Sequence, residues 1–270
     1  MNITFIGGGN MANALIGGML GRGFAASGIR VVEPNADTAG KLRAQYGIAT
    51  HAEAGAEALT SDLIVLAVKP QQLRGVAAGL APHMNSQLVV SIAAGVRAAD
   101  LARWLGNHRR VVRAMPNTPA MVLAGVTGLY ALPDVTADER ERAQRVLAAV
   151  GEVVWVEAEA DMDVITAVSG SGPAYVFYFM EGLEEAAIAQ GLSAEQARRL
   201  SLATFAGAAQ LAARSAEDVA TLRARVTSKG GTTERAVHAM EAARLKQIIV
   251  DAVRAAAARS KELGDELGAD

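Results

Sequence analysis

The chain lacks cysteine altogether, and only 4% of its 270 residues are aromatic. Without cysteine it can form neither a disulfide nor a thiolate site, whether for a metal or for catalysis. Its four histidines are scattered and make no pair at metal-ligand spacing, so we expect no metal site. Long apolar runs are absent as well, because none reaches the roughly 18 residues that a membrane-spanning helix needs.

A strong excess of charge of either sign is also missing. The formal net charge is −2, which gives no electrostatic reason to expect a nucleic acid or an anionic membrane as a partner. Only Met1 and Asn2 precede the first expected strand, which leaves no room for a signal peptide. We therefore expect a soluble protein located in the cytoplasm.

Short apolar runs alternate with amphipathic stretches up to about residue 156. This pattern predicts strands that alternate with helices, and hence an α/β fold with a Rossmann-type, doubly wound parallel sheet. The expected strands are residues 3–6, 30–33, 63–68, 88–92, 111–114 and 153–156, and the first two helices are residues 10–22 and 36–46.

The strand pattern stops at about Asp161, and alanine- and leucine-rich helical patterns follow. They are residues 173–190, 194–214, 216–225, 233–241 and 242–263. An acidic, turn-like patch at 157–161 separates the two patterns. We therefore expect a dinucleotide-binding domain of residues 1–158 and an all-helical domain of residues 159–270.

A glycine-rich turn, Gly7-Gly8-Gly9-Asn10-Met11-Ala12, follows the first expected strand and opens the first helix. In a dinucleotide-binding turn, the glycine at the position of Gly7 permits the tight bend and the one at Gly9 lets the backbone approach a pyrophosphate. The helix N-terminus then offers free N–H groups to the phosphates. The alternative is a glycine-rich turn without a ligand, but the order of strand, glycines and helix favours binding.

The identity of the dinucleotide depends on Glu33, at the end of the second expected strand. An acid at this place usually binds the ribose 2′-hydroxyl of NAD, and it would repel the 2′-phosphate of NADP unless Asn35, Lys41 or Arg43 compensated. The alternative is a glutamate that simply faces water.

Two later strand ends are expected at the same edge of the sheet, residues 67–71 and 91–95. Pro70 is expected to end its strand, and the small residues 93–95 leave room for a flat ring. Lys69 either reaches the cofactor or is a solvated lysine on a loop.

The segment Ser228-Lys229-Gly230-Gly231-Thr232-Thr233 lies between two helical patterns. It reads as a glycine-rich loop that ends at a helix start, where backbone N–H groups bind a carboxylate well. The alternative is helix capping alone, for which Thr233 would serve. Residues 169–173 form a second small, polar turn that could line the same cavity.

Lysine is absent between Lys69 and Lys229, and the expected helix 173–190 carries no basic residue. A dehydrogenase that acts on a secondary alcohol usually needs a positioned base. The absence counts against a β-hydroxyacid dehydrogenase, a family with a catalytic lysine in that helix.

Taken together, the motifs resemble pyrroline-5-carboxylate reductase over nearly the whole chain. They are Gly-Gly-Gly-Asn-Met-Ala at 7–12, Ala-Val-Lys-Pro-Gln at 67–71, Met-Pro-Asn-Thr-Pro at 115–119, Ser-Gly-Ser-Gly-Pro-Ala-Tyr at 169–175 and Thr-Ser-Lys-Gly-Gly-Thr-Thr at 227–233. The resemblance implies reduction of Δ1-pyrroline-5-carboxylate to L-proline, the last step of proline synthesis. It also implies an N-terminal Rossmann domain and a helical domain that interlocks with a partner's, giving a homodimer, often a ring of dimers (a decamer), with sites shared between subunits.

The resemblance also assigns residues and a cofactor. NADP(H) is expected first, with NAD(H) as the alternative. The implied cofactor residues are Ile6, Gly7, Gly8, Gly9, Asn10, Met11, Ala67, Val68, Lys69, Pro70, Ala93, Ala94 and Gly95, and the implied substrate residues are Ser228, Gly230, Gly231, Thr232 and Thr233. Thr233 would be the catalytic residue, which orients the ring nitrogen and relays a proton.

Two departures from the family pattern stand out. Many relatives carry proline at the position of Lys229, and Glu33 points to NAD where the family often prefers NADPH. The turn at 113–119 could serve the cofactor, the substrate or structure alone. An imine reductase, or a cofactor sensor that has lost catalysis, are the remaining alternatives.

Overall fold

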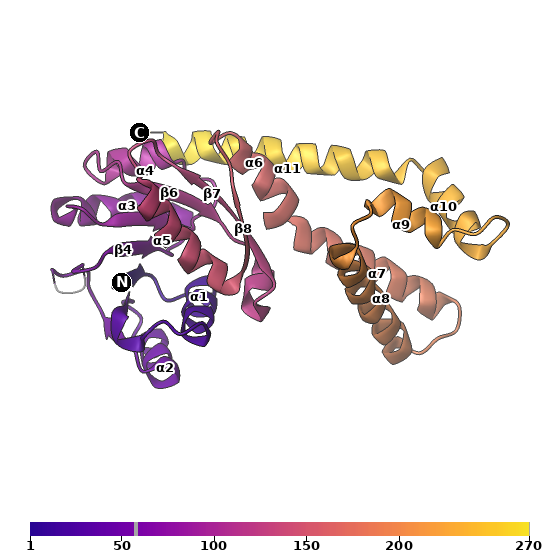
Figure 1. Ribbon diagram of the computed structural model, residues 1–270, viewed down its shortest axis with the longest axis horizontal. Helices are drawn as coiled ribbons and strands as arrows, with labels where there is room; N and C mark the ends of the chain where they lie inside the picture. Colours follow the sequence, from indigo (N-terminus) through magenta and orange to yellow (C-terminus); the bar gives the residue numbers. More distant parts are fainter. Residues whose placement is uncertain (57–58, 270) are drawn as a thin grey trace. The chain divides into compact units, whose positions relative to one another are not determined.

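A sheet of eight strands, in the order β3-β2-β1-β4-β5-β6-β7-β8, forms the centre of the N-terminal half of the chain (Figure 1). The computed structural model describes residues 1–56 and 59–269. The strands are β1 (Ile3–Ile6), β2 (Ile29–Val32), β3 (Ala49–His51), β4 (Leu63–Leu66), β5 (Leu88–Ser91), β6 (Val111–Met115), β7 (Gly125–Ala131) and β8 (Gly151–Trp155).

Neighbouring strands run parallel except at one pair, because β7 runs antiparallel to β6, with Val112 opposite Ala131. The expected α/β Rossmann-type sheet is therefore confirmed, with its last two strands, β7 and β8, running opposite to the other six. Two strands were not expected. β3 has only three residues and is partly polar, and β7 contains two glycines, which are unfavourable inside a strand.

Helices cover both faces of the sheet, which makes it doubly wound. Those of this region are α1 (Asn10–Gly21), α2 (Ala36–Tyr46), α3 (Pro70–Leu80), α4 (Ala98–Trp104), α5 (Ala137–Leu147) and α6 (Asp161–Ile165), with short 3₁₀ turns at Ala26–Gly28, Ala81–His83, Thr118–Val122 and Ala148–Val150. Residues of α1, α2 and α5 pack with Phe5 and Val65 in one core cluster. Residues of α3 and α4 pack with Ile64 and Leu66 in the other. Side chains alternate between the two faces along each strand, as the period of a β-strand requires.

The segments around Pro70 and Ser169 differ from expectation. β4 ends at Leu66, and Pro70 begins α3 instead of ending a strand, because its fixed φ suits the first turn of a helix. Residues 169–173 do not form a turn: Thr166–Gly170 is a π-helical turn, in which the Ser171 N–H donates to the Thr166 carbonyl at 2.9 Å. The Ser169 hydroxyl donates to the Ile165 carbonyl at 2.9 Å, which keeps this polar residue within a helix.

The chain divides by its contacts into two units. The sheet unit comprises residues 1–171 and 255–270, and the helical unit comprises Gly172–Arg254. The helical unit contains α7 (Gly172–Ala189), α8 (Ala194–Arg214), α9 (Val219–Arg225), α10 (Thr232–Ala242) and the first part of α11 (Leu245–Gly268). The expectation of an all-helical C-terminal region is confirmed.

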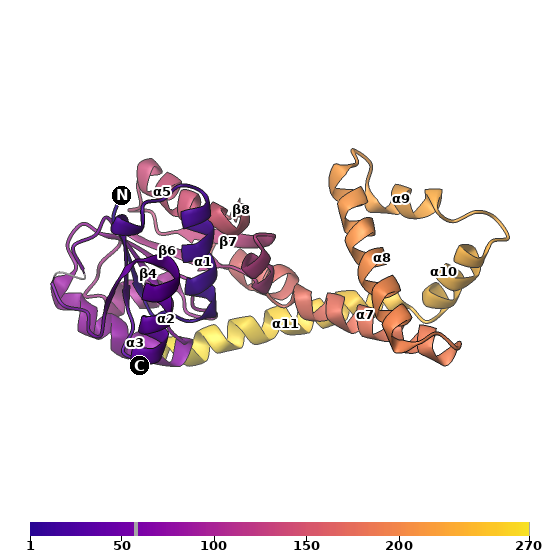
Figure 2. The same cartoon turned by 90° about the horizontal axis from the view of Figure 1, so that it is seen from below.

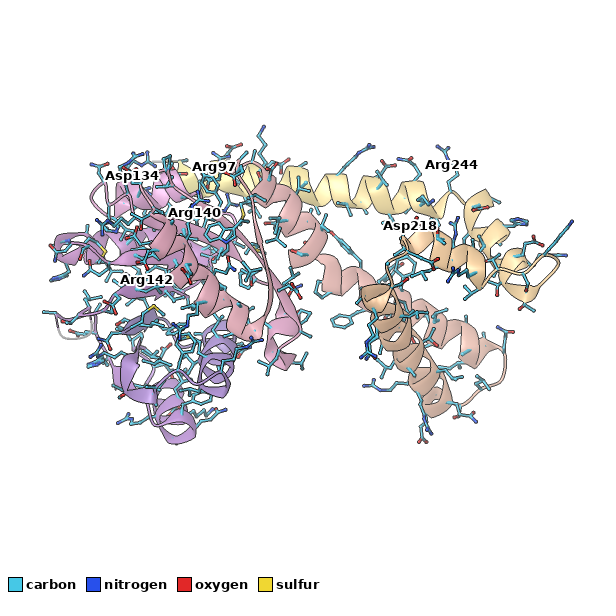
Figure 3. All side chains as sticks on the ribbon, in the orientation of Figure 1. Arg97, Asp134, Arg140, Arg142, Asp218 and Arg244 are labelled. Atoms are coloured by element: carbon cyan, nitrogen blue, oxygen red, sulfur yellow. The ribbon has the colours of Figure 1, made fainter. Side chains whose placement is uncertain are left out.

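Within the helical unit, α7 and α8 pack against each other (Figure 2). The Ser201 hydroxyl of α8 donates to the Met180 carbonyl of α7 at 3.1 Å. Ser193 and Gln196 form a capping box at the start of α8, and Asp218 caps α9 by accepting from the Ala220 and Thr221 N–H groups (Figure 3). Among the described residues, no helix is both long and apolar enough to span a membrane.

The last turns of α11 belong to the sheet unit and are held there by polar contacts. Arg97 forms an ion pair with Asp265 and lies beside this end of the helix (Figure 3). Arg103 and Arg74 donate to the carbonyls of Gly268 and Ala269, at 2.9 and 3.2 Å. These bonds satisfy carbonyls at the helix C-terminus that have no partner inside the helix.

Candidate functional site

A cleft of about 680 Å³ lies at the carboxyl ends of the first strands of the sheet. This is where open α/β sheets bind their ligands, and the volume suits a small molecule or cofactor. The cleft is lined by Ile6, Gly7, Gly8, Gly9, Val32, Glu33, Pro34, Ala52, Glu53, Ala54, Ala67, Val68, Lys69, Gln72, Gly75, Val76, Gly79 and Leu80.

The backbone requires glycine at Gly7, whereas Gly9 leaves the start of the helix open. Gly7 has a φ of +98°, and a Cβ there would lie 2.8 Å from the Ala67 carbonyl oxygen. Its N–H donates to the Val32 carbonyl at 2.9 Å, which locks the turn to β2. Gly9 begins the helix as the N-cap of α1 without a side-chain cap, and a Cβ there would meet nothing within 4 Å. The N-terminus of α1 therefore has an open face where a phosphate could accept its N–H groups.

Glu33 is fixed in this cleft. One carboxylate oxygen accepts from the Gly8 N–H at 2.9 Å, and the other accepts from the Asn35 N–H at 2.9 Å. The half-buried side chain thus bridges the glycine turn and the loop between β2 and α2. The alternative of a glutamate that only faces water is wrong.

The residues implied for the cofactor fall into three groups, of which the third is the segment 93–95. Ile6 to Gly9 and Ala67 to Lys69 line the cleft, whereas Asn10 and Met11 begin α1 and Pro70 begins α3. Lys69 is exposed.

The segment 93–95 does not line this cleft. Ala93 belongs to the core, and Ala94 is exposed. Gly95, with a φ of +78°, packs closely, because a Cβ there would lie 3.2 Å from the Leu267 side chain.

Several lining residues were missed by the sequence analysis. Gln72, Gly75, Val76 and Gly79 come from one face of α3, and their spacing of three or four is that of a helix face. The small residues along Pro70–Leu80 were the available signal. Ala52, Glu53 and Ala54 follow β3, a strand that the sequence did not reveal.

The predicted substrate segment forms a tight turn before α10. The Gly231 N–H donates to the Ser228 carbonyl at 3.0 Å, and Gly230 has a φ of +74°. Gly231 is the N-cap and the helix begins at Thr232, so the expectation that Thr233 could serve as the cap is wrong. A glycine N-cap leaves the first N–H groups of the helix without a side-chain partner.

A carboxylate already binds at this turn. The Gly230 N–H donates to Glu234 Oε2 at 2.7 Å. Neither Thr232 nor Thr233 makes a side-chain hydrogen bond within residues 1–56 and 59–269. The turn therefore presents a backbone donor that a carboxylate oxygen can reach, beside two hydroxyls that the fold does not use.

The turn at 113–119, whose role the sequence left open, is tied into the sheet unit. Arg113 is buried and pairs with Glu159 at 3.2 Å and with Asp163 at 3.6 Å. The Asn117 amide donates to the Ser169 carbonyl at 3.0 Å and accepts from the Val126 N–H at 2.9 Å. The polar groups of both side chains thus have partners within the protein, which gives these two residues a structural role. In the described ranges, no group of three or more histidine, aspartate or glutamate side chains could hold a metal ion.

Comparison with known proteins also finds two different parts in this chain, an N-terminal and a C-terminal one. A family model described as pyrroline-5-carboxylate reductase dimerisation matches residues 159–263, and one described as NADP oxidoreductase coenzyme F420-dependent matches residues 2–95. The pyrroline-5-carboxylate reductase of Pseudomonas aeruginosa is 47% identical over 268 residues, which cover 98% of each chain.

Two solved structures extend the likeness to three dimensions. A pyrroline-5-carboxylate reductase from Coxiella burnetii has a TM-score of 0.93 and 42% identity, covering 97% of this chain and 98% of that one. The Plasmodium falciparum pyrroline carboxylate reductase, crystallised with NADP bound, has a TM-score of 0.84 and 29% identity over 98% of each chain. With a relative 47% identical over almost its full length, this chain belongs to the pyrroline-5-carboxylate reductase family.

Proposed function

We propose that this chain reduces Δ1-pyrroline-5-carboxylate to L-proline with NADPH or NADH, the last step of proline synthesis. The full-length likeness to Pseudomonas aeruginosa pyrroline-5-carboxylate reductase is the observation that carries the proposal. The two-part architecture supports it, because a glycine turn suited to a dinucleotide and a turn suited to a small carboxylate occur in one chain.

The dinucleotide would bind at the glycine turn, where the fold fits it. The open face of Gly9 at the start of α1 would take the pyrophosphate, with Gly8 and Lys69 lining the same cleft. The bound cofactor, NADP(H) or alternatively NAD(H), would supply a hydride. Asn10, Met11, Pro70 and the segment 93–95 remain proposals for the same site.

The substrate carboxylate would be held by the turn before α10. Ser228 and Thr232 would donate to it through their hydroxyls and Gly230 through its N–H, while Gly231, whose N–H donates to the Ser228 carbonyl, would hold the turn around it. The substrate is a cyclic imine that is activated by protonation on nitrogen, so hydride delivery requires alignment more than a strong base. Good alignment alone contributes about 7–11 kcal/mol to lowering a barrier.

Thr233 would be the catalytic residue. Thr233 is the second residue of α10, and its hydroxyl makes no hydrogen bond within the described parts of the chain. It is therefore available to the ring nitrogen of the substrate. A threonine hydroxyl is too weak an acid to drive protonation, so its role would be to orient the ring and relay a proton.

The helical unit would form the contact with a second copy of the chain. Within the described residues, Ala197 and Ser201 are its only buried positions, while Phe177 and Tyr178 are 62% and 77% exposed. An apolar surface of this extent favours a protein interface, and the matched family description names dimerisation for residues 159–263. We propose an interlocked homodimer that forms a ring of dimers, a decamer. We also propose that the boundary between the two domains lies between residues 158 and 159. A cytoplasmic location stays a prediction.

The test is a spectrophotometric assay of the purified chain. Δ1-pyrroline-5-carboxylate is mixed with NADPH or with NADH, and oxidation is followed as loss of the near-ultraviolet absorbance of the reduced nicotinamide. The proposal requires substrate-dependent oxidation with at least one cofactor, and formation of proline in equal amount. Binding of cofactor without any oxidation would overturn it in favour of a sensor.

A further inference from the structure

The charge of Glu33 is held in place at the end of β2 by two loops. Both carboxylate oxygens accept backbone N–H groups, from Gly8 and from Asn35, each at 2.9 Å. Hydrogen bonds to an ionised acceptor are among the stronger ones in proteins, so this carboxylate cannot readily swing out of the cleft. A carboxylate offers about four lone-pair sites, which leaves about two for a ligand.

The surroundings of Glu33 offer little to a second anion. The Asn35 side chain accepts from the Thr38 N–H at 2.9 Å, so two N–H groups near the start of α2 already have partners within the protein. Asp37 lies in the first turn of the same helix. Of the charged residues that line the cleft, Glu33 and Glu53 are acids and Lys69 is the cation.

We propose that Glu33 is the residue that sets the ratio in which this enzyme uses NADPH and NADH. The inference rests on the proposed function, because it assigns Glu33 to the adenosine end of that cofactor site. The free lone pairs of the carboxylate accept the ribose hydroxyls of NADH. A 2′-phosphate, with its charge of about −2, meets a fixed negative charge whose neighbouring N–H donors are already taken.

The test compares the unchanged full-length protein with Glu33→Gln and Glu33→Ser. Glutamine removes the charge and keeps an oxygen for one of the two N–H groups. Serine removes the charge and is also too short to reach the two N–H groups, so that a 2′-phosphate can accept from the Gly8 and Asn35 N–H groups instead. We expect the ratio of kcat/KM for NADPH to that for NADH to rise about tenfold or more in Glu33→Ser, and by a smaller factor in Glu33→Gln. The ratio should change because the KM values for the two cofactors change, while kcat stays nearly the same.

Binding of two adenine nucleotides, measured by calorimetry, separates this role from the function itself. We expect Glu33→Ser to bind adenosine 2′,5′-bisphosphate more tightly than the unchanged protein does, and to bind 5′-AMP more weakly. Glu141→Gln, which removes an exposed carboxylate from α5, is the matched control and should leave both affinities unchanged.

Thermal unfolding confirms that each variant is folded. A folded Glu33 variant with an unchanged ratio and unchanged nucleotide affinities would overturn the role of Glu33 alone. Failure of the unchanged protein to bind either nucleotide would overturn the cofactor site, and the proposed function with it.

Discussion

The hydroxyl of Ser260 donates to Asp163 Oδ1 at 2.8 Å, and so joins α11 to α6 across 97 positions of the chain. Asp163 also lies 3.6 Å from the guanidinium of Arg113, which is buried and pairs with Glu159. The end of the last helix is thus attached to the sheet unit through a network of charged and polar groups. In a setting of low dielectric such a network stabilises the fold only while each member keeps its partners.

Ser260→Ala should therefore lower the stability of the protein. The buried hydroxyl is lost and Asp163 keeps only its ion pair, which should reduce the free energy of unfolding by about 1–2 kcal/mol. Denaturant unfolding followed by tryptophan fluorescence measures the change. Glu262→Gln, an exposed neighbour on α11, should change it by less than about 0.5 kcal/mol. Equal effects of the two substitutions would mean that the contact with Asp163 contributes nothing to stability.

Substitution by alanine should have different effects on folding at Gly7 and at Gly9. Gly9 has a φ of −69° and open space in front of it, so Gly9→Ala should fold normally. Its methyl group would occupy the face where the pyrophosphate is proposed to bind, and dinucleotide affinity should fall about tenfold or more.

Gly7→Ala should weaken both folding and binding. The positive φ and the contact of 2.8 Å with the Ala67 carbonyl oxygen strain any side chain at this position. Thermal unfolding and a fluorescence titration with NADPH, run on both variants, give the comparison. Normal cofactor affinity in Gly9→Ala would exclude the pyrophosphate from this turn.

The glycine turn could be predicted from the sequence because its requirements are local. A strand, the glycine spacing and a helix follow one another within Ile3–Gly21, and the backbone at Gly7 strains any other residue. The Gly-rich turn before α10 is local in the same way. There the sequence misplaced only the cap, which is Gly231.

The contacts of Glu33 could not be predicted in this way. Its bond to the Gly8 N–H joins residues 25 positions apart and depends on how the second βα loop folds over the first. The return of α11 to the sheet unit is of the same kind, because Ser260 and Asp163 carry no pattern that pairs them. The face of α3 that lines the cleft is marked only by small residues, which also occur where helices simply pack.

Thr233→Ala should lower turnover of Δ1-pyrroline-5-carboxylate while the affinity for NADPH stays nearly unchanged. The substitution removes a hydroxyl that has no partner in the fold, so stability should hardly change. Loss of a group that aids proton transfer typically costs about 10²–10⁴ in rate. Steady-state kinetics and a separate cofactor titration measure the two effects. Thr233→Ser, which keeps the hydroxyl, should retain most of the activity, and weakened cofactor binding by Thr233→Ala would contradict the assignment.

Glu234 should compete with the substrate for the turn before α10. Its carboxylate accepts the Gly230 N–H at 2.7 Å, which is one of the donors proposed for the substrate carboxylate. The substrate must displace Glu234 from that donor or share it with a second negative charge. In Glu234→Gln the amide oxygen is a weaker, uncharged acceptor, because a charge-assisted hydrogen bond is roughly twice as strong as a neutral one.

The expected result is a KM for Δ1-pyrroline-5-carboxylate several-fold lower in Glu234→Gln, with kcat changed little, because the competition concerns binding and not the transfer step. Glu241→Gln removes an exposed carboxylate from the same helix and should leave KM unchanged. A higher KM in Glu234→Gln would show the opposite role, in which the carboxylate holds the Gly230 turn in the conformation that binds substrate. Comparing the two variants at low and at high salt tests the electrostatic origin, since a repulsion between carboxylates that solvent reaches is screened as ionic strength rises.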